Sequence, residues 1–243
     1  MHRVLIPPVA VREGPLTISD PRTLHHLLHV LRVEAGEPLE CFDGQGRRYL
    51  GSVIRCTPRA LVVKVDKTCE EPPPALRITL VQALIKPERF EWVIEKATEL
   101  GVTRILPLLT ARTTTRMGSG GATTRLRRWQ RIVASAATQC GRAALPRLAA
   151  PQRFEATLTE LQGSPAFLFS PAAEEVWEER LPQMTQRGEL AIFIGPEGDF
   201  TPEERALASR AGVQLVRLRS TILRSETAAV AVVAILQHAA GAL

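Results

Sequence analysis

Residues 189–204 read ELAIFIGPEGDFTPEE, and this stretch decides the fold. Its first six residues form a largely apolar run of the length typical of a buried strand. A loop with two glycines and a proline follows. Thr201 then opens a helix, because Pro202 suits the first helical turn and Glu204 completes a capping box with Thr201. The stretch therefore predicts a buried strand that leads through a tight loop into a helix.

The same alternation of strands and helices extends on both sides of this stretch. Including the strand at 189–194, we predict strands at 76–85, 103–109, 166–170, 189–194 and 213–218, and further helices at 88–100, 125–140, 173–181 and 226–240. Strands that alternate with helices form parallel sheets. The sequence therefore predicts an α/β fold in which helices cover both faces of a parallel sheet.

Three prolines at 72–74 interrupt the chain ahead of this region. Prolines in a row fit neither a helix nor a central strand, so the segment reads as a stiff linker. Before it, we predict one helix at 22–31 and strands at 37–42, 48–55 and 60–65. We therefore expect two domains: a small, mostly β, barrel-like domain over residues 1–71 and the α/β domain over residues 75–243.

Positive charge is concentrated in one part of the chain. The net charge is +6, yet residues 100–154 contain ten arginines and no acidic residue, so the remainder is net acidic. These arginines are Arg104, Arg112, Arg116, Arg125, Arg127, Arg128, Arg131, Arg142, Arg147 and Arg153. Clustered arginines favour a polyanion such as nucleic acid. The plainer interpretation is a solvated helix face.

Position on the predicted elements separates the arginines of this window. Arg112 and Arg142 fall near the ends of predicted elements, beside the expected site, which favours them as phosphate contacts. The arginines at 125, 127, 128 and 131 share a helix with Leu126 and Trp129, which mark its buried side. Helical spacing spreads the four over two faces, so we expect that not all of them bind nucleic acid.

Several classes of protein are excluded by composition and by missing motifs. No apolar run approaches the roughly 18 residues that a membrane span needs. The four cysteines form no Cys-x-x-Cys pair, so we expect no metal site. The glycine loops typical of dinucleotide and nucleoside triphosphate sites are also missing. No signal-peptide core is visible, and we expect a cytoplasmic protein. His25, His26 and His29 share a short helix, and an exposed helix face explains them more simply than a ligand site.

A second loop joins the first at the predicted end of the sheet. Residues 218–227 read LRSTILRSET and follow the last predicted strand. Ligands of parallel sheets bind beyond the carboxyl ends of the strands, where both loops begin. Arg224 and Glu226 then stand at the start of the last helix, with Ser225 as a plausible cap. An acidic residue at a helix N-terminus interacts favourably with the helix dipole. This interaction alone could explain Glu226 without any functional role.

The two loops together resemble a known family. The sequence GPEG at 195–198, followed by ILRSETA at 222–228, is similar to SPOUT-class RNA methyltransferases, and more narrowly to the 16S rRNA uridine-N3 methyltransferases. The resemblance covers the whole chain and includes HLLHVLR at 26–32, LECFDG at 39–44, EKATELGV at 95–102 and QCGR at 139–142. The chain departs from the family pattern at Asp199 and Arg219, where glycine is usual, and at Thr221, which is often arginine.

This resemblance implies a methyl transfer from S-adenosylmethionine to N3 of a uridine in 16S rRNA, either naked or in the assembled small ribosomal subunit. It also implies a PUA-like barrel for the first domain, a C-terminal trefoil knot formed by the two loops, and a homodimer. The implied catalytic residues are Arg224, as the cation near the uracil, and Glu226; either Glu226 or Glu197 could accept a proton or simply fix the loop. The implied RNA-binding residues are Arg32, Lys86, Arg112 and Arg142. The implied cofactor-binding residues are Gly195, Pro196, Glu197, Gly198, Leu218, Ile222, Leu223, Thr227 and Ala228.

Three alternatives stay open at this point. The chain could be an RNA-binding ribosome-assembly protein with a vestigial pocket. It could be a SPOUT methyltransferase that acts on another RNA base or on ribose. It could also be an unrelated α/β enzyme that uses a small anionic substrate.

Overall fold

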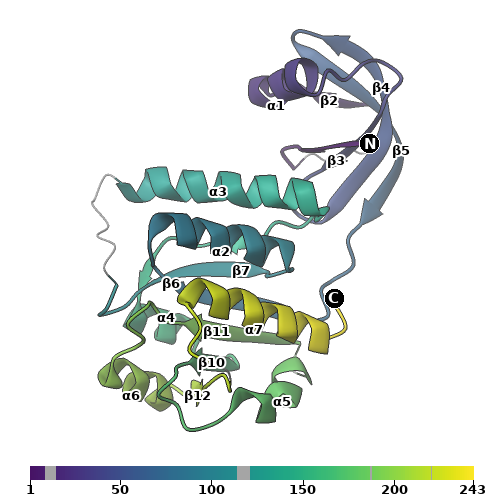
Figure 1. Ribbon diagram of the computed structural model, residues 1–243. Helices are drawn as coiled ribbons and strands as arrows, with labels where there is room; N and C mark the ends of the chain where they lie inside the picture. Colours follow the sequence, from purple (N-terminus) through teal and green to yellow (C-terminus); the bar gives the residue numbers. More distant parts are fainter. Residues whose placement is uncertain (9–14, 114–120, 187, 220) are drawn as a thin grey trace. The chain divides into compact units, whose positions relative to one another are not determined.

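A computed structural model describes residues 1–8, 15–113, 121–186, 188–219 and 221–243. Arg116 of the basic window and Ser220 of the second loop lie outside the described residues. The chain divides into two compact units, which are residues 1–73 with 134–145, and residues 74–133 with 146–243. Figure 1 labels the helices and strands of both.

The first unit is built on a five-stranded sheet in the order β1-β3-β4-β5-β2. Its strands are β1 (His2–Leu5), β2 (Leu16–Ile18), β3 (Pro38–Phe42), β4 (Arg47–Thr57) and β5 (Ala60–Glu70). β1 lies parallel to β3, and the other pairs are antiparallel. The sequence predicted β3, β4 and the first half of β5, whereas the short strands β1 and β2 were missed.

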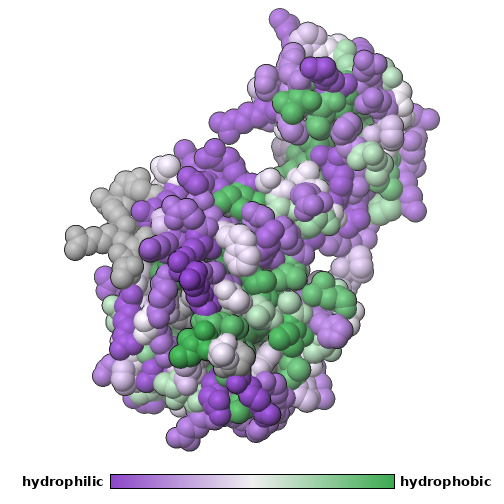
Figure 2. Space-filling view, viewed as in Figure 1, coloured by the Kyte–Doolittle hydropathy of each residue, from purple (hydrophilic) through white to green (hydrophobic). Residues whose placement is uncertain are grey.

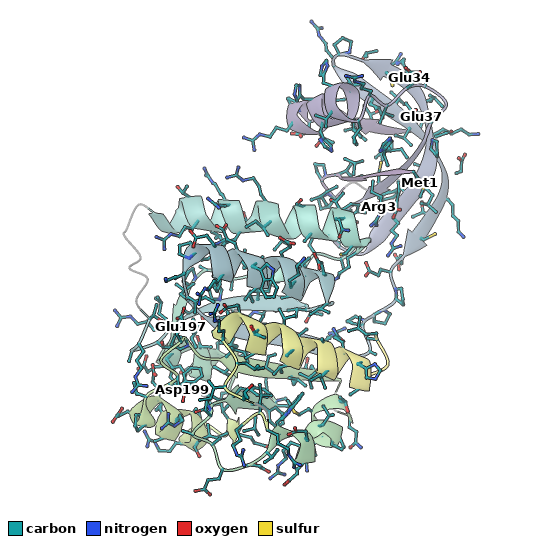
Figure 3. All side chains as sticks on the ribbon, in the orientation of Figure 1. Met1, Arg3, Glu34, Glu37, Glu197 and Asp199 are labelled. Atoms are coloured by element: carbon teal, nitrogen blue, oxygen red, sulfur yellow. The ribbon has the colours of Figure 1, made fainter. Side chains whose placement is uncertain are left out.

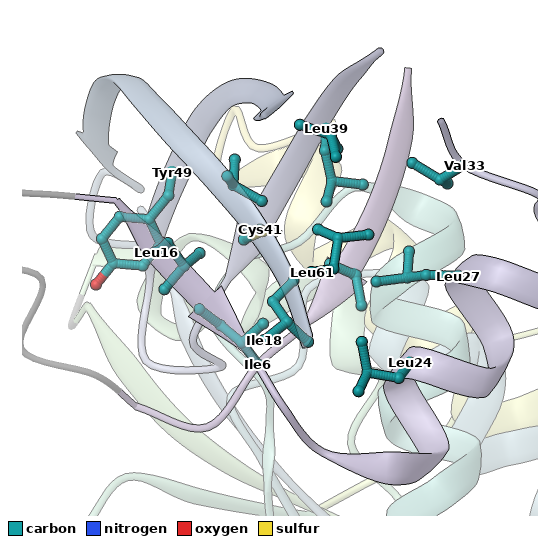
Figure 4. Packing of buried hydrophobic residues seen from close by; sticks show 13 residues of the cluster. Ile6, Leu16, Ile18, Leu24, Leu27, Val33, Leu39, Cys41, Tyr49 and Leu61 are labelled. Atoms are coloured by element: carbon teal, nitrogen blue, oxygen red, sulfur yellow. The ribbon is translucent and has the colours of Figure 1, made fainter. Parts of the chain in front are cut away.

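Apolar side chains from the sheet and from one helical segment form the core of this unit (Figure 4). The predicted helix at 22–31 is in fact α1 (Pro21–His25) followed by one π-helical turn, η1 (His26–Val30). Asp20 caps α1 by accepting a hydrogen bond from the Thr23 amide at 2.8 Å. Leu24 in α1 and Leu27 in η1 are both buried in this core.

The second unit contains a parallel sheet in the order β12-β10-β11-β6-β7-β8, with β9 also paired to β7. Every strand pair in it is parallel, as the sequence predicted. The strands are β6 (Arg77–Ala83), β7 (Arg104–Leu109), β8 (Arg147–Leu148), β9 (Gln152–Arg153), β10 (Ala166–Phe169), β11 (Glu189–Ile194) and β12 (Gln214–Val216). The two-residue strands β8 and β9 were not predicted, because so short a run carries no periodicity.

Helices cover both faces of this sheet (Figure 1). On one face, Val81 and Phe193 pack in a core with residues of α4 and α6. On the other, the Gln82 side chain reaches Ser225 at the start of α7. Neighbouring residues of β6 therefore point to opposite helical layers. The helices are α2 (Pro87–Glu99), α3 (Gly121–Cys140), α4 (Phe154–Glu160), α5 (Leu181–Gln186), α6 (Pro202–Arg210) and α7 (Ser225–Ala239).

The predicted helix at 173–181 is wrong. Residues 171–175 form a turn and a bend, Val176 forms a parallel bridge with Arg217, a 3-10 turn η2 (Trp177–Glu179) follows, and α5 begins only at Leu181. The cause is tertiary, because the Arg217 amide donates to the Glu175 carbonyl at 2.8 Å and the Trp177 amide to the Arg217 carbonyl at 3.1 Å. The chain there pairs with the segment after β12 instead of with itself.

The capping box expected at the start of α6 is confirmed. The Glu204 amide donates to Thr201 Oγ1 at 3.2 Å, and the Thr201 amide donates to Glu204 Oε2 at 2.9 Å. The other oxygen of Glu204 accepts a hydrogen bond from the Ala111 amide at 2.8 Å. The cap therefore also fixes the chain after β7 against the loop that leads into α6.

Candidate functional site

A pocket of about 410 Å³ lies in the second unit, beyond the carboxyl ends of β10, β11 and β12. Three segments form its walls: the end of β10, the loop after β11, and the segment from the end of β12 into α7. The lining residues are Phe169, Ser170, Pro171, Ile194, Gly195, Pro196, Glu197, Asp199, Arg217, Leu218, Thr221, Ile222, Leu223, Arg224, Ser225 and Ala228. The two loops expected to meet do meet at one pocket.

Most of the residues expected to bind a cofactor line this pocket. Gly195, Pro196, Glu197, Leu218, Ile222, Leu223 and Ala228 do so, as does Arg224. Gly198, Thr227 and Glu226 do not line it. Ile222 is 83% exposed, so it offers an apolar side chain at the rim rather than in the floor.

A chain of hydrogen bonds joins the sheet, the first loop and α7 below the pocket. The buried Gln82 amide donates to Ser225 Oγ at 2.9 Å, and Ser225 Oγ donates to the Gly195 carbonyl at 2.5 Å. Gly195 has no room for a side chain, because a Cβ there would lie 3.0 Å from the ring of buried Phe200. The loop after β11 is therefore held in a fixed place against the start of α7.

Arg89, in the first turn of α2, links the two acidic residues of the loops. Its Nη1 lies 3.5 Å from Glu197 Oε1, and its Nε lies 3.5 Å from Glu226 Oε1. Glu226 is 13% exposed, and no described residue bonds its buried Oε2. Arg89 was missed by the sequence analysis, although the first turn of a helix that follows a strand end is a place where site residues occur.

Arg224 stands at the mouth of the pocket, directly before α7. It is the N-cap residue of α7, with extended backbone at φ −64° and ψ 152°, and its side chain makes no capping hydrogen bond. Within the described part of the chain, neither Glu197 nor Glu226 forms an ion pair with it, since Arg89 holds both. Arg224 is exposed and lines the pocket, and is therefore placed to contact a ligand there.

Asp199 lines the pocket, although the sequence analysis did not predict it as a site residue and named it only as a departure from the family pattern. Its Oδ2 accepts a hydrogen bond from Ser170 Oγ at 2.6 Å and lies 3.3 Å from Nη1 of Arg205. Figure 3 labels Glu197 near the start of α7 and Asp199 below it, toward α6. The residue Ser170, at the end of β10, was missed because nothing in its local sequence marks it.

The four residues expected to bind RNA fall in different units. Lys86 is exposed just before α2, and Arg112 donates a hydrogen bond to the Gly198 carbonyl, both in the second unit. Arg32 and Arg142 belong to the first unit. Arg32 is exposed and has a left-handed backbone (φ 53°), whereas burial lowers the pKa of the Arg142 guanidinium against the opposing effect of Glu71.

The remaining sequence expectations concern metals, histidines and membrane spans. The part of the chain that the structure describes contains no group of three or more His, Cys, Asp or Glu side chains able to hold a metal ion. The rings of His25 and His29 lie 4.9 Å apart between centroids, tilted by 42°, and both residues line a separate hollow of the first unit. Among the described helices, none has both the length and the apolar character that crossing a bilayer requires.

Two family models match the chain. A model described as an RNA methyltransferase domain matches residues 71–237, and one described as an RNA methyltransferase PUA domain matches residues 18–66. Curated proteins named ribosomal RNA small subunit methyltransferase E are similar. That of Mycobacterium tuberculosis is 34% identical over 89% of this chain and 84% of its own length. That of Synechocystis is 34% identical over 93% and 74%.

Solved structures are similar over nearly the whole chain. A putative methyltransferase from Legionella pneumophila, determined with bound cofactor S-adenosylmethionine, has a TM-score of 0.87 at 31% identity and covers 98% of this chain and 97% of its own. A ribosomal RNA small subunit methyltransferase E from Neisseria gonorrhoeae, bound to S-adenosylmethionine, has a TM-score of 0.85 at 29% identity, with the same coverage.

Proposed function

The chain belongs to the RNA methyltransferase family, and on that premise we propose that it transfers a methyl group from S-adenosylmethionine to N3 of a uridine in 16S rRNA. The observation that carries the proposal is the single pocket formed by the two loops at the carboxyl ends of β11 and β12. Two similar structures contain S-adenosylmethionine, and one of them is named a small-subunit rRNA methyltransferase.

The pocket residues fit this cofactor. A volume of about 410 Å³ suits a nucleoside-sized ligand, and such pockets combine an apolar lining with a few polar groups. Ile194, Leu218, Leu223 and Ala228 supply apolar surface for an adenine ring, while Glu197 and Asp199 supply acceptors. When bound, S-adenosylmethionine supplies an activated methyl group on a sulfonium, so the protein mainly has to align donor and acceptor.

The chain's own residues then act on the uracil. N3 loses a weakly acidic proton, so a cation near the uracil carbonyls stabilises the charge that develops on the ring. Arg224 is placed for that role by its exposure at the pocket mouth. Glu226 Oε1 lies 3.5 Å from Arg89 Nε. We propose that this ion pair helps to fix the loop, and that Glu226 also takes part in proton transfer. N3 lies on the Watson–Crick edge, so the base must be unpaired or extruded to react.

The proposal includes the architecture that the resemblance implies. We assign residues 1–71 to a PUA-like RNA-binding barrel and residues 75–243 to the methyltransferase domain with a C-terminal knot. The knot is what the resemblance implies; the two loops that would form it lie together, since Ser225 Oγ donates to the Gly195 carbonyl. The proposed rRNA substrate places the enzyme in the cytoplasm.

The nucleoside content of rRNA tests the proposed function directly. Mass spectrometry of 16S rRNA nucleosides from cells with and without the gene is expected to show 3-methyluridine only when the protein is present. A different methylated base or ribose would redirect the proposal to another RNA position. Unchanged nucleosides, together with no binding of S-adenosylmethionine, would favour an assembly protein with a vestigial pocket. A preference for small anions over rRNA would indicate an unrelated enzyme.

Arg112 is expected to contact RNA phosphate. Arg112→Ala should weaken RNA binding across sequences and reduce the slope of log affinity against log salt by about one, because one phosphate contact is lost. The same result is expected for Arg142→Ala. Titrations of RNA at several salt concentrations measure both slopes.

Arg128 provides a matched control for this prediction. Its guanidinium already pairs with Glu91, with Nε 2.6 Å from Oε1 and Nη2 2.7 Å from Oε2. Arg128→Ala removes the same charge from the same basic window and should leave the salt slope unchanged. Unchanged slopes for Arg112→Ala and Arg142→Ala would contradict their assignment to phosphate.

We also expect a two-fold homodimer. The exposed apolar residues of the second unit include Ile235 on α7, at 42%, and Ile222 in the loop before it, at 83%. Figure 2 shows hydrophobic surface along the position of α7. Exposed apolar surface of this kind marks association sites. Light scattering at micromolar concentration should give twice the chain mass, and a monomer there would contradict the prediction.

A further inference from the structure

Asp199 has a backbone conformation that few residues other than glycine adopt. Its φ is +61°, and its amide donates to the Pro196 carbonyl at 3.0 Å, which closes the turn after β11. Aspartate is tolerated in the left-handed region better than most residues, yet it is still disfavoured there. The aspartate side chain in this conformation makes specific contacts with residues of two neighbouring elements.

The Asp199 carboxylate is held against the wall of the pocket. Ser170 Oγ donates to its Oδ2 at 2.6 Å, and Arg205 Nη1 lies 3.3 Å from the same oxygen. Ser170 is itself 2% exposed, and Arg205 is anchored by donating to the Phe200 carbonyl at 2.6 Å. Both contacts use Oδ2, so neither occupies Oδ1. The carboxylate is thus oriented by residues of β10 and α6 while it lines the cavity.

The other carboxylate of the pocket lining is engaged differently. Glu197 is paired with Arg89 on α2 at 3.5 Å, and its side chain is 43% exposed. Asp199 is paired with Arg205 at 3.3 Å through Oδ2, its side chain is only 22% exposed, and it also lines the cavity. A carboxylate that is fixed by neighbours and faces a cavity is suited to a cationic N–H donor, because charge-assisted hydrogen bonds are short and strong.

We propose that Ser170, Asp199 and Arg205 form an ammonium subsite, in which the Asp199 carboxylate accepts a hydrogen bond from the α-ammonium of the cofactor's amino-acid portion. This inference rests on the proposed function, since it assumes that the pocket takes S-adenosylmethionine. The ammonium is favoured over the sulfonium because the ammonium has three N–H donors and the sulfonium has none. Arg205 and Ser170 act as positioning residues that keep the carboxylate oriented.

Three ligands and one conservative variant test the subsite. Asp199→Asn keeps the size of the side chain and tolerates the left-handed backbone, but removes the charge. Calorimetry should show affinity for S-adenosylmethionine and for S-adenosylhomocysteine lowered about 10- to 100-fold, the loss expected for one hydrogen bond to a charged group. Affinity for 5′-methylthioadenosine, which lacks the amino-acid portion, should be unchanged.

Other outcomes overturn the assignment. A loss for S-adenosylmethionine alone would place the sulfonium at Asp199, and equal losses for all three ligands would show that Asp199 only shapes the loop. Unchanged affinity for all three would remove Asp199 from recognition. If the unaltered protein bound none of the ligands, the proposed function itself would fail, and that failure is distinguishable from these.

Glu203→Gln is the matched control for charge. Glu203 is an exposed carboxylate in the first turn of α6 and is not among the lining residues of the pocket. Removing its charge should leave all three affinities unchanged. A loss as large as that of Asp199→Asn would attribute the effect to general electrostatics and overturn the subsite. Thermal unfolding without ligand confirms that both variants remain folded.

Discussion

Arg224→Ala is expected to slow methyl transfer by about 10²–10³-fold, while affinity for S-adenosylmethionine and RNA changes far less. This is the range for losing one donor that stabilises developing charge in a transition state. Arg224 stands exposed at the pocket mouth, and no described acidic residue of the two loops holds it. Single-turnover rates at saturating cofactor and RNA measure the effect. A near-normal rate would remove Arg224 from the mechanism.

Arg89→Ala is the control that distinguishes a catalytic role of Arg224 from a structural role in holding the loop. Arg89 pairs with both Glu197 and Glu226, so its loss leaves two carboxylates uncompensated, one of them nearly buried. This variant should lose cofactor affinity and stability together with rate. If Arg224→Ala shows the same joint loss, its role is bracing rather than catalysis. Arg224→Lys should largely rescue a simple charge role but not a bidentate contact, because lysine lacks the planar fork of arginine.

Much of the α/β unit could be predicted because its signals are local. The parallel strands β6, β7, β10 and β11 are continuous apolar runs bounded by loops, and the Thr201–Glu204 cap announces α6. The pocket followed from the same logic, since loops at the carboxyl ends of parallel strands meet. These features depend on residues close together in sequence, so a single chain reveals them.

Features decided by distant contacts could not be predicted. Residues 173–181 have helical character, but pairing with the segment at Arg217 overrides it. Arg89 joins Glu197 and Glu226 across more than one hundred residues of sequence, and no spacing rule announces that ion pair. The Ser170–Asp199 hydrogen bond has the same origin. The ion pair of Glu197 and this hydrogen bond involve residues of the pocket. The sequence therefore predicted where the site lies more completely than it predicted the contacts between its side chains.

Gly195→Ala is expected to lower affinity for S-adenosylmethionine about 10- to 100-fold and the free energy of unfolding by about 1–3 kcal/mol, the usual cost of overpacking a core. A Cβ at Gly195 would lie 3.0 and 3.1 Å from two carbons of the Phe200 ring. That ring is fully buried and packs on Phe154 at 5.6 Å between centroids, so its neighbours resist a shift of the ring. We therefore expect the Gly195 backbone to move instead.

Such a movement is damaging because of what Gly195 holds. Its carbonyl accepts the 2.5 Å hydrogen bond from Ser225, which in turn accepts from Gln82, so a shift separates the first loop from the start of α7. Gly198→Ala is the comparison within the same loop: its Cβ would meet the Arg112 side chain at 3.2 Å and no buried ring, so it should cost less than Gly195→Ala, although Gly198 is itself an expected cofactor-binding residue. Calorimetry measures the affinity of both variants for S-adenosylmethionine, and denaturant unfolding measures their free energies of unfolding. Equal losses at the two positions, or retained affinity in Gly195→Ala, would show that the junction beneath the pocket does not shape the cofactor site.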